Sequence, residues 1–121
     1  MNILAIDDNE IIADGYKFRF GAKSFTKYLD FSQELHRERP DLLLLDLDIG
    51  VPGVNGWTIT DEARELYPDV PIIIATAHDD DTQKEMAKIK GVDFWAKGCI
   101  EDLKILRELV TRYGKPDRTD C

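Results

Sequence analysis

The sequence has little cysteine, no long hydrophobic run and fewer positive than negative charges. Two cysteines in 121 residues are too few for a disulfide scaffold, and neither has a second Cys or a His at zinc-ligand spacing. No stretch approaches the roughly 20 apolar residues of a membrane span, and the N-terminal region lacks the basic flank of a signal peptide. These absences argue against secreted and membrane-spanning classes and favour a cytoplasmic protein with reduced thiols.

The shortage of basic residues gives the chain a formal net charge of −8, from 16 Lys and Arg against 24 Asp and Glu. Because phosphate backbones and anionic headgroups attract basic side chains, we expect neither nucleic-acid nor membrane binding. The hydrophobic fraction of 43% suffices for an ordinary core. The length suits one domain, which we expect to occupy residues 1–113, with residues 114–121 as a flexible C-terminal tail.

Short apolar runs predict the strands. Ile3–Ile6, Leu42–Leu45 and Ile72–Ala75 have the continuous pattern of strands buried on both faces of a parallel sheet. Weaker patterns predict two more strands, one within Ala22–Leu29 and one at Val92–Ala96. Helical patterns follow these runs at Glu10–Phe20, Phe31–Arg39, Trp57–Tyr67, Thr82–Lys90 and Glu101–Tyr113.

Strand and helix therefore alternate five times along the chain. This order predicts an α/β domain, a doubly wound five-stranded parallel sheet with helices on both faces. We expect the second helix to begin with a capping box from Asp30 to Gln33 and to end at Pro40, which cannot continue a helix.

Polar and charged residues follow the strands at the edge where open parallel sheets bind ligands. Carboxylates that converge there would repel one another, and a hard cation such as Mg²⁺, which prefers oxygen ligands, relieves that repulsion. A hydroxyl and an ammonium group beside them would hold phosphoryl oxygens. The pattern predicts a phosphoryl-transfer pocket with a carboxylate nucleophile. Its candidate residues are Asp7, Asp8, Asp46, Asp48, Thr76 and Lys97.

Five stretches carry a recognisable combination of motifs. They are Ile3–Asp8, Arg39–Asp46, Pro52–Gly56, Ile73–Asp80 and Gly91–Lys97. Each is a weak motif alone, but together, in this order and spacing, they resemble the receiver domain of two-component response regulators over residues 2–113. The resemblance implies a flavodoxin-like fold and a signalling protein rather than an enzyme.

The resemblance also implies roles for the site residues. Asp7 and Asp8 would organise Mg²⁺ together with Asp46, with Asp8 favoured over Asp7 as the direct ligand. Asp46 would accept the phosphoryl group. Thr76 would contact that group after transfer, and Lys97 would pair with it.

The resemblance implies partners as well. A histidine kinase or a phosphotransfer protein would donate the phosphoryl group. Phe94, three residues before Lys97, occupies the position of the family's switch aromatic, whose rotamer follows the movement of the threonine. The altered face formed by the fourth helix, fifth strand and fifth helix would then bind a downstream protein. With no output domain in these residues, we expect a stand-alone receiver.

Two aspartates compete for the role of phosphoacceptor. Counting forward from Pro40 through the four leucines gives Asp46, whereas counting back four residues from Pro52 gives Asp48. We favour Asp46, because a strand extended to Asp48 would bury the Asp46 carboxylate without an evident partner. This choice predicts about two extra residues, relative to the family pattern, between the third strand and the turn that contains Pro52.

Two alternatives remain open from the sequence. The apolar run with Asp46 and Asp48 in Leu42–Val51 also fits a phosphohydrolase of the haloacid-dehalogenase type, although Asp7 and Asp8 lie upstream of it. The second alternative is a degenerate receiver that binds a partner without being phosphorylated.

Overall fold

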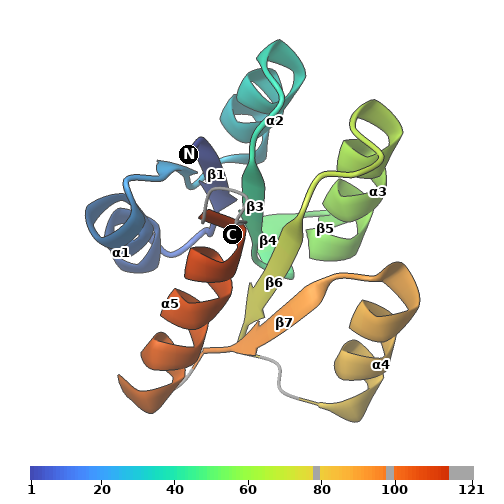
Figure 1. Cartoon of the computed structure of the whole chain (residues 1–121). Helices are drawn as coiled ribbons and strands as arrows, with labels where there is room; N and C mark the ends of the chain where they lie inside the picture. Colours follow the sequence, from blue (N-terminus) through green and yellow to red (C-terminus); the bar gives the residue numbers. More distant parts are fainter. Residues whose placement is uncertain (78–79, 98–99, 115–121) are drawn as a thin grey trace.

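A five-stranded parallel sheet lies at the centre of the structure (Figure 1), a computed structural model that describes residues 1–77, 80–97 and 100–114. The strand order is β2-β1-β3-β6-β7, and every neighbouring pair is parallel. Of the expected tail, Gly114 is the last residue of a helix, and residues 115–121 lie outside the described residues. The five strands are β1 (Ile3–Ile6), β2 (Lys23–Phe25), β3 (Leu42–Leu45), β6 (Ile72–Thr76) and β7 (Asp93–Ala96).

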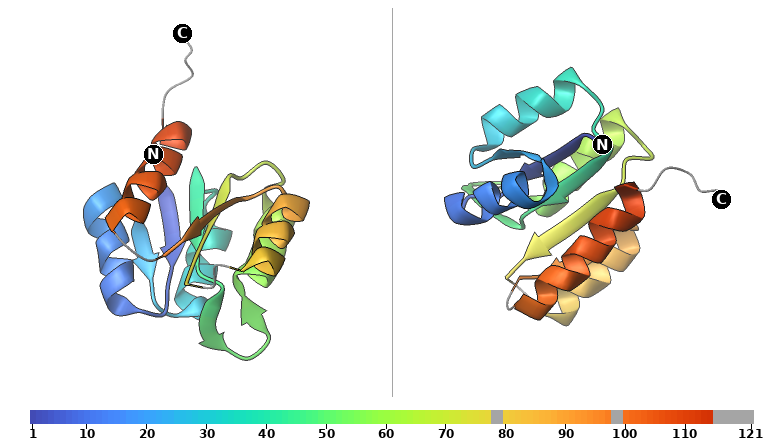
Figure 2. Two further views of the ribbon diagram at one scale, coloured as in Figure 1. Left: turned by 90° about the horizontal axis from the view of Figure 1, so that it is seen from below. Right: turned by 60° about the vertical axis from the view of Figure 1, so that its left-hand side comes forward.

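Within the described part of the chain, five helices cover the two faces of this sheet. They are α1 (Glu10–Phe20), α2 (Tyr28–Arg37), α3 (Gly56–Leu66), α4 (Asp81–Lys90) and α5 (Ile100–Gly114). Helices α1 and α5 lie on one face, and α2, α3 and α4 lie on the other (Figures 1 and 2). Among the described residues, no helix combines the length and the apolar character needed to cross a membrane.

The apolar strand runs supply both cores, because successive strand residues point to opposite faces. Leu43 and Leu45 of β3 belong to one core with Phe31 of α2, whereas Leu42 and Leu44 belong to the other core with α1 and α5. All four leucines are fully buried. The doubly wound α/β fold predicted from the sequence is therefore confirmed.

The start of α2 differs from the prediction. The helix begins at Tyr28, its N-cap is Lys27, and no side chain caps it, so the predicted capping box at Asp30 is wrong. Tertiary contacts hold this first turn instead: the hydroxyls of Tyr28 and Ser32 donate to the two carboxylate oxygens of Glu62 on α3, at 2.6 and 3.0 Å. A short-range sequence pattern carries no information about such a contact.

A small hairpin, which the sequence analysis did not predict, connects β3 to α3. Its strands are β4 (Asp48–Val51) and β5 (Val54–Asn55), and they pair in antiparallel fashion. Pro52 and Gly53 form the turn; the proline ring fixes the first central φ and Gly53 has a φ of 77°, which is the pattern of a type II turn. The hairpin lies where two extra residues were expected.

Candidate functional site

Backbone hydrogen bonds continue the sheet one residue beyond its strands and thereby position three of the predicted site residues. The amide of Asp7 donates to a carbonyl of β2 at 3.0 Å, and that of Asp46 donates to a carbonyl of β1 at 3.2 Å. The amide of Lys97 donates to the carbonyl of Thr76 at 2.7 Å. These residues therefore project from the carboxyl edge of the sheet with their backbones fixed.

The carboxylates of Asp7, Asp8 and Asp46 meet at this edge. One oxygen from each lies within 4.8 Å of the others. Asp7 and Asp46 are buried, with 1% and 4% of their surface exposed, whereas Asp8 is exposed. An open cavity of about 510 Å³, called the acidic cavity below, adjoins the three carboxylates. It is lined by Asp7, Asp8, Asn9, Ile12, Asp46, Asp48, Ala77 and Lys97.

Lys97 bridges the two buried carboxylates. Its Nζ lies 2.5 Å from Oδ2 of Asp7 and 3.3 Å from Oδ1 of Asp46. The other oxygen of Asp7 accepts the amide of Asn9 at 2.9 Å, while Oδ1 of Asp46 also accepts the amide of Asp48 at 3.4 Å. One ammonium group therefore opposes the charge of two buried acids, and a net negative charge remains at the site.

This imbalance shows in the ionisation of Asp46. Burial and the negative charge of Asp7 raise the pKa of the Asp46 carboxyl, against the opposing effects of Lys97 and of the Asp48 amide. The site consequently favours the uptake of positive charge. A divalent cation with oxygen ligands would supply it, because the donor set consists of carboxylates.

The remaining predicted residues take different positions around the acidic cavity. Asp48 is exposed at the start of the hairpin and lines the cavity. Thr76 ends β6 and is fully buried, and its neighbour Ala77 lines the cavity. Phe94 is half-buried against the core that includes α2 and α3, whereas Trp95 packs in the opposite core. The adjacent aromatic residues thus face opposite sides of the sheet, as strand geometry requires.

Two residues without a predicted role help to build the site. Asn9 caps α1, accepting the amides of Ile11 and Ile12, and its own amide donates to Asp7. Gly56 lies where α3 begins, and a Cβ there would lie only 2.8 Å from the carbonyl oxygen of Asp46. The asparagine followed by Glu10 is a recognisable N-cap signal, whereas the close approach at Gly56 depends on the tertiary fold.

Tyr16 of α1 is a third residue without a predicted role that lies near the site. It is 4% exposed, and its hydroxyl has no hydrogen-bond partner among the described residues. Burial raises the pKa of this hydroxyl, and the charges of Asp7 and Asp46 raise it further, so the phenol stays protonated. The protonated hydroxyl of Tyr16, which has no hydrogen-bond partner in the described part of the chain, is therefore close enough to the two buried acids for their charges to act on it.

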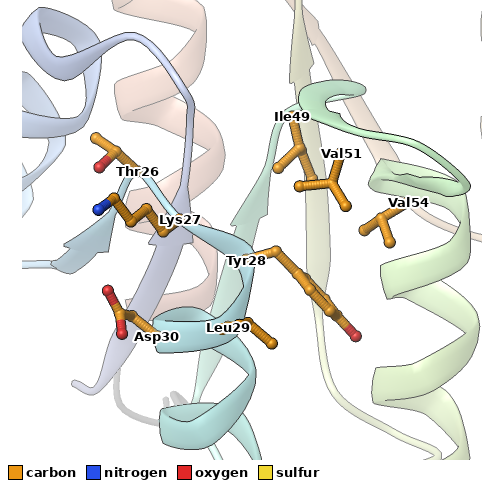
Figure 3. Close-up of a pocket in the computed structure, with 8 residues that line it drawn as sticks. All are labelled: Thr26, Lys27, Tyr28, Leu29, Asp30, Ile49, Val51 and Val54. Atoms are coloured by element: carbon orange, nitrogen blue, oxygen red, sulfur yellow. The ribbon is translucent and has the colours of Figure 1, made fainter.

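A second cavity beside the hairpin is largely apolar (Figure 3). The ring of Tyr28 extends across it from α2 toward α3, opposite Ile49, Val51 and Val54 of the hairpin. Its remaining lining residues are Thr26, Lys27, Leu29 and Asp30, which do not form a carboxylate cluster. Among the described residues, the cluster of three carboxylates therefore lies at the acidic cavity and not at this one.

Comparison with known proteins gives a consistent result. Residues 3–111 match the protein-family model described as the response regulator receiver domain. The chain is similar to the N-terminal domain of the nisin resistance regulator NsrR, with 28% identity, 94% of this chain and 97% of that chain covered, and a TM-score of 0.75.

Two further structures share the fold. The receiver domain of NtrX from Brucella abortus has 21% identity and a TM-score of 0.78, with 93% of this chain and 97% of that chain covered. A CheY-like receiver domain protein from Methanospirillum hungatei JF-1 has 18% identity and a TM-score of 0.76, with 93% of each chain covered.

The approach of α3 to the site predicts opposite effects for two glycine substitutions. Gly56→Ala should lower the free energy of unfolding by about 1 to 3 kcal/mol, because its Cβ would press on the Asp46 backbone. Gly15→Ala should raise it by about 0.5 to 1 kcal/mol, since Gly15 is inside α1 and its Cβ would meet only the tip of the Arg19 side chain. Urea unfolding measures both free energies. If the two substitutions destabilised the protein equally, the close approach of Gly56 to the Asp46 backbone would not be the cause.

The raised pKa of Asp46 predicts a pH-dependent stability difference. Without metal, the folded protein retains a proton on this carboxyl at a pH where the unfolded chain has released it. The wild type should therefore lose stability relative to Asp46→Asn as the pH rises from about 5 to about 7.5. We expect the variant to exceed the wild type by about 1 kcal/mol or more at the upper pH, measured by urea unfolding in EDTA. A difference that does not vary with pH would contradict this.

Proposed function

Because the chain belongs to the response regulator receiver domain family, we propose that it accepts a phosphoryl group on Asp46 and signals by binding another protein. Receiver domains are signalling modules that interact with histidine kinases and downstream effectors, and they generally bind Mg²⁺ at an acidic pocket. The observation that carries the proposal is the meeting of Asp7, Asp8 and Asp46 beside Lys97.

The carboxylates of Asp7, Asp8 and Asp46 fit Mg²⁺ by their chemistry. They are hard oxygen donors whose mutual repulsion a divalent cation would relieve, and the exposure of Asp8 leaves that side open to water and to a phosphoryl group. When bound, Mg²⁺ would supply positive charge to the phosphoryl oxygens. We propose Asp7, Asp8 and Asp46 as the residues that hold it.

The transfer itself is carried by Asp46. One of its carboxylate oxygens attacks the phosphorus of a phosphohistidine, the phosphorus–nitrogen bond breaks, and its electron pair returns to the imidazole of the donor. Lys97, which already lies against the Asp46 carboxylate, would pair with the incoming phosphoryl oxygens. Its ammonium thus stays within reach of the negative charge before and after the transfer.

Several features support Asp46 over Asp48 as the acceptor. Asp46 follows β3 directly, is buried, and lies against Lys97. Asp48 instead begins the hairpin and is exposed. In the proposed site Asp48 borders the cavity that the phosphoryl group enters.

The response to phosphorylation is assigned to two residues near the carboxyl ends of β6 and β7. Thr76, whose carbonyl accepts the Lys97 amide, would contact the phosphoryl group, and Phe94 would change rotamer with it. The proposed donor is a histidine kinase or a phosphotransfer protein in the cytoplasm. The proposed output is a protein contact through the face formed by α4, β7 and α5.

A small-molecule phosphodonor tests the assignment without the cognate kinase. With acetyl phosphate and Mg²⁺, intact-mass analysis should show one phosphoryl adduct on the wild type and on Asp48→Asn, and none on Asp46→Asn. The two variants form a matched pair, because each replaces one carboxylate by an amide and the two positions are two residues apart. An adduct that persists in Asp46→Asn would refute the acceptor, and sustained hydrolysis of a phosphate monoester would favour a phosphohydrolase.

A further inference from the structure

A third cavity shares a lining residue with the acidic cavity and extends to α4. It measures about 300 Å³ and is lined by Leu47, Asp48, Asn55, Trp57 and Gln83. Asp48 lines this cavity and the acidic one. Residues of the hairpin, of the start of α3 and of the start of α4 therefore all line this cavity.

Hydrogen bonds and the strand pairing of the hairpin connect Asp46 to the start of α3. The amide of Asp48 donates to Oδ1 of Asp46 at 3.4 Å, and Asp48 faces Asn55 in the antiparallel register of the hairpin. The Asn55 side chain accepts the amides of Trp57 and Thr58 at 2.8 and 3.0 Å, and Thr58 completes a capping box. The backbone of Asp48 is thus tied to the first turn of α3.

A side-chain hydrogen bond continues these contacts to α4. The indole Nε1 of Trp57 donates to Oε1 of Gln83 at 2.8 Å, in a partly buried position. The amide of Gln83 in turn donates to the side chain of Asp80, the N-cap of α4, at 2.9 Å. This series of contacts reaches the first turn of α4 without passing through Thr76 or Phe94.

We propose that the Trp57–Gln83 hydrogen bond couples the chemical state of Asp46 to the position of the first turn of α4. The inference rests on the proposed phosphorylation of Asp46. The free carboxylate of Asp46 accepts a stronger hydrogen bond from the Asp48 amide than the acyl phosphate does, because a hydrogen bond to a charged acceptor is stronger than one to a neutral acceptor. A restraint on α4 that acts through the hairpin therefore favours the free carboxylate.

Linkage gives the direction of the effect. If the Trp57–Gln83 bond favours the free carboxylate, its removal must strengthen the binding of a phosphoryl group or its analogue by the same factor. A hydrogen bond between neutral groups contributes about 1 kcal/mol, which corresponds to about fivefold in an affinity. Because the indole and the amide are uncharged, added salt should leave this factor unchanged.

The test measures the binding of beryllium trifluoride, a phosphoryl analogue, by isothermal titration calorimetry at saturating Mg²⁺. Gln83→Leu should bind it about fivefold more tightly than the wild type. Gln83→Glu keeps an oxygen acceptor for the indole and makes the hydrogen bond charge-assisted, so this variant should bind the analogue no more tightly than the wild type. Glu85→Leu makes a similar apolar change at an exposed position of the same helix and should have no effect.

A double-mutant cycle separates coupling from a merely structural role. Trp57→Phe removes the indole donor but keeps an aromatic ring, so it should reproduce the effect of Gln83→Leu, and combining the two should add nothing further. The amide NMR signals of Thr82–Lys84 should shift on addition of the analogue in the wild type and in Gln83→Glu. These shifts should be reduced in Gln83→Leu, an effect that a change in stability alone would not produce.

The outcomes distinguish this inference from the proposed function. Equal affinity of Gln83→Leu and the wild type, weaker binding by Gln83→Leu, or additive effects in the cycle would overturn the coupling. A wild type that binds no analogue and forms no phosphoryl adduct on Asp46 would instead overturn the proposed function. Far-ultraviolet circular dichroism identifies any variant that fails to fold, and the Gln83→Glu comparison then still tests the acceptor.

Discussion

The ammonium group of Lys97 between the buried carboxylates of Asp7 and Asp46 is the contact on which the site depends. Two acids with almost no exposed surface lie at one sheet edge, and one lysine opposes them both. Removing that lysine would leave two buried charges without compensation, which is far more costly than losing an exposed pair. Among the described residues, Lys97 alone forms ion pairs with these two acids, and this shortage of positive charge is the physical basis of the proposed cation binding.

The placement of these groups follows from the fold. Parallel strands end at the same edge, so residues 90 positions apart, Asp7 and Lys97, form a direct ion pair. The backbone hydrogen bonds of the sheet extend one residue beyond β1, β3 and β7, and they fix the backbone positions of Asp7, Asp46 and Lys97. The leucines of β3 hold that edge in place by filling both cores. Stability and chemistry therefore come from the same strands, with apolar residues inside and charged residues at the ends.

The sequence predicted the parts of the structure whose signals are local. The apolar runs identified β1, β3 and β6, and the acids that follow β1 and β3 indicated the cavity. It did not predict the start of α2, because Glu62 holds that turn from another helix. Nor did it predict the hairpin, since Asp48–Val51 is too short to distinguish from a loop, although the displaced position of Pro52 did indicate extra residues.

The central claim is that Asp8, together with the two buried acids, forms a Mg²⁺ site, and calorimetric titration of Mg²⁺ tests it most directly. The account predicts that the wild type binds Mg²⁺ and that Asp8→Ala binds it about tenfold more weakly or worse. Asp14→Ala removes the same charge from an exposed position on α1 and should bind Mg²⁺ as the wild type does. Equal losses in both variants, or none in Asp8→Ala, would contradict the account.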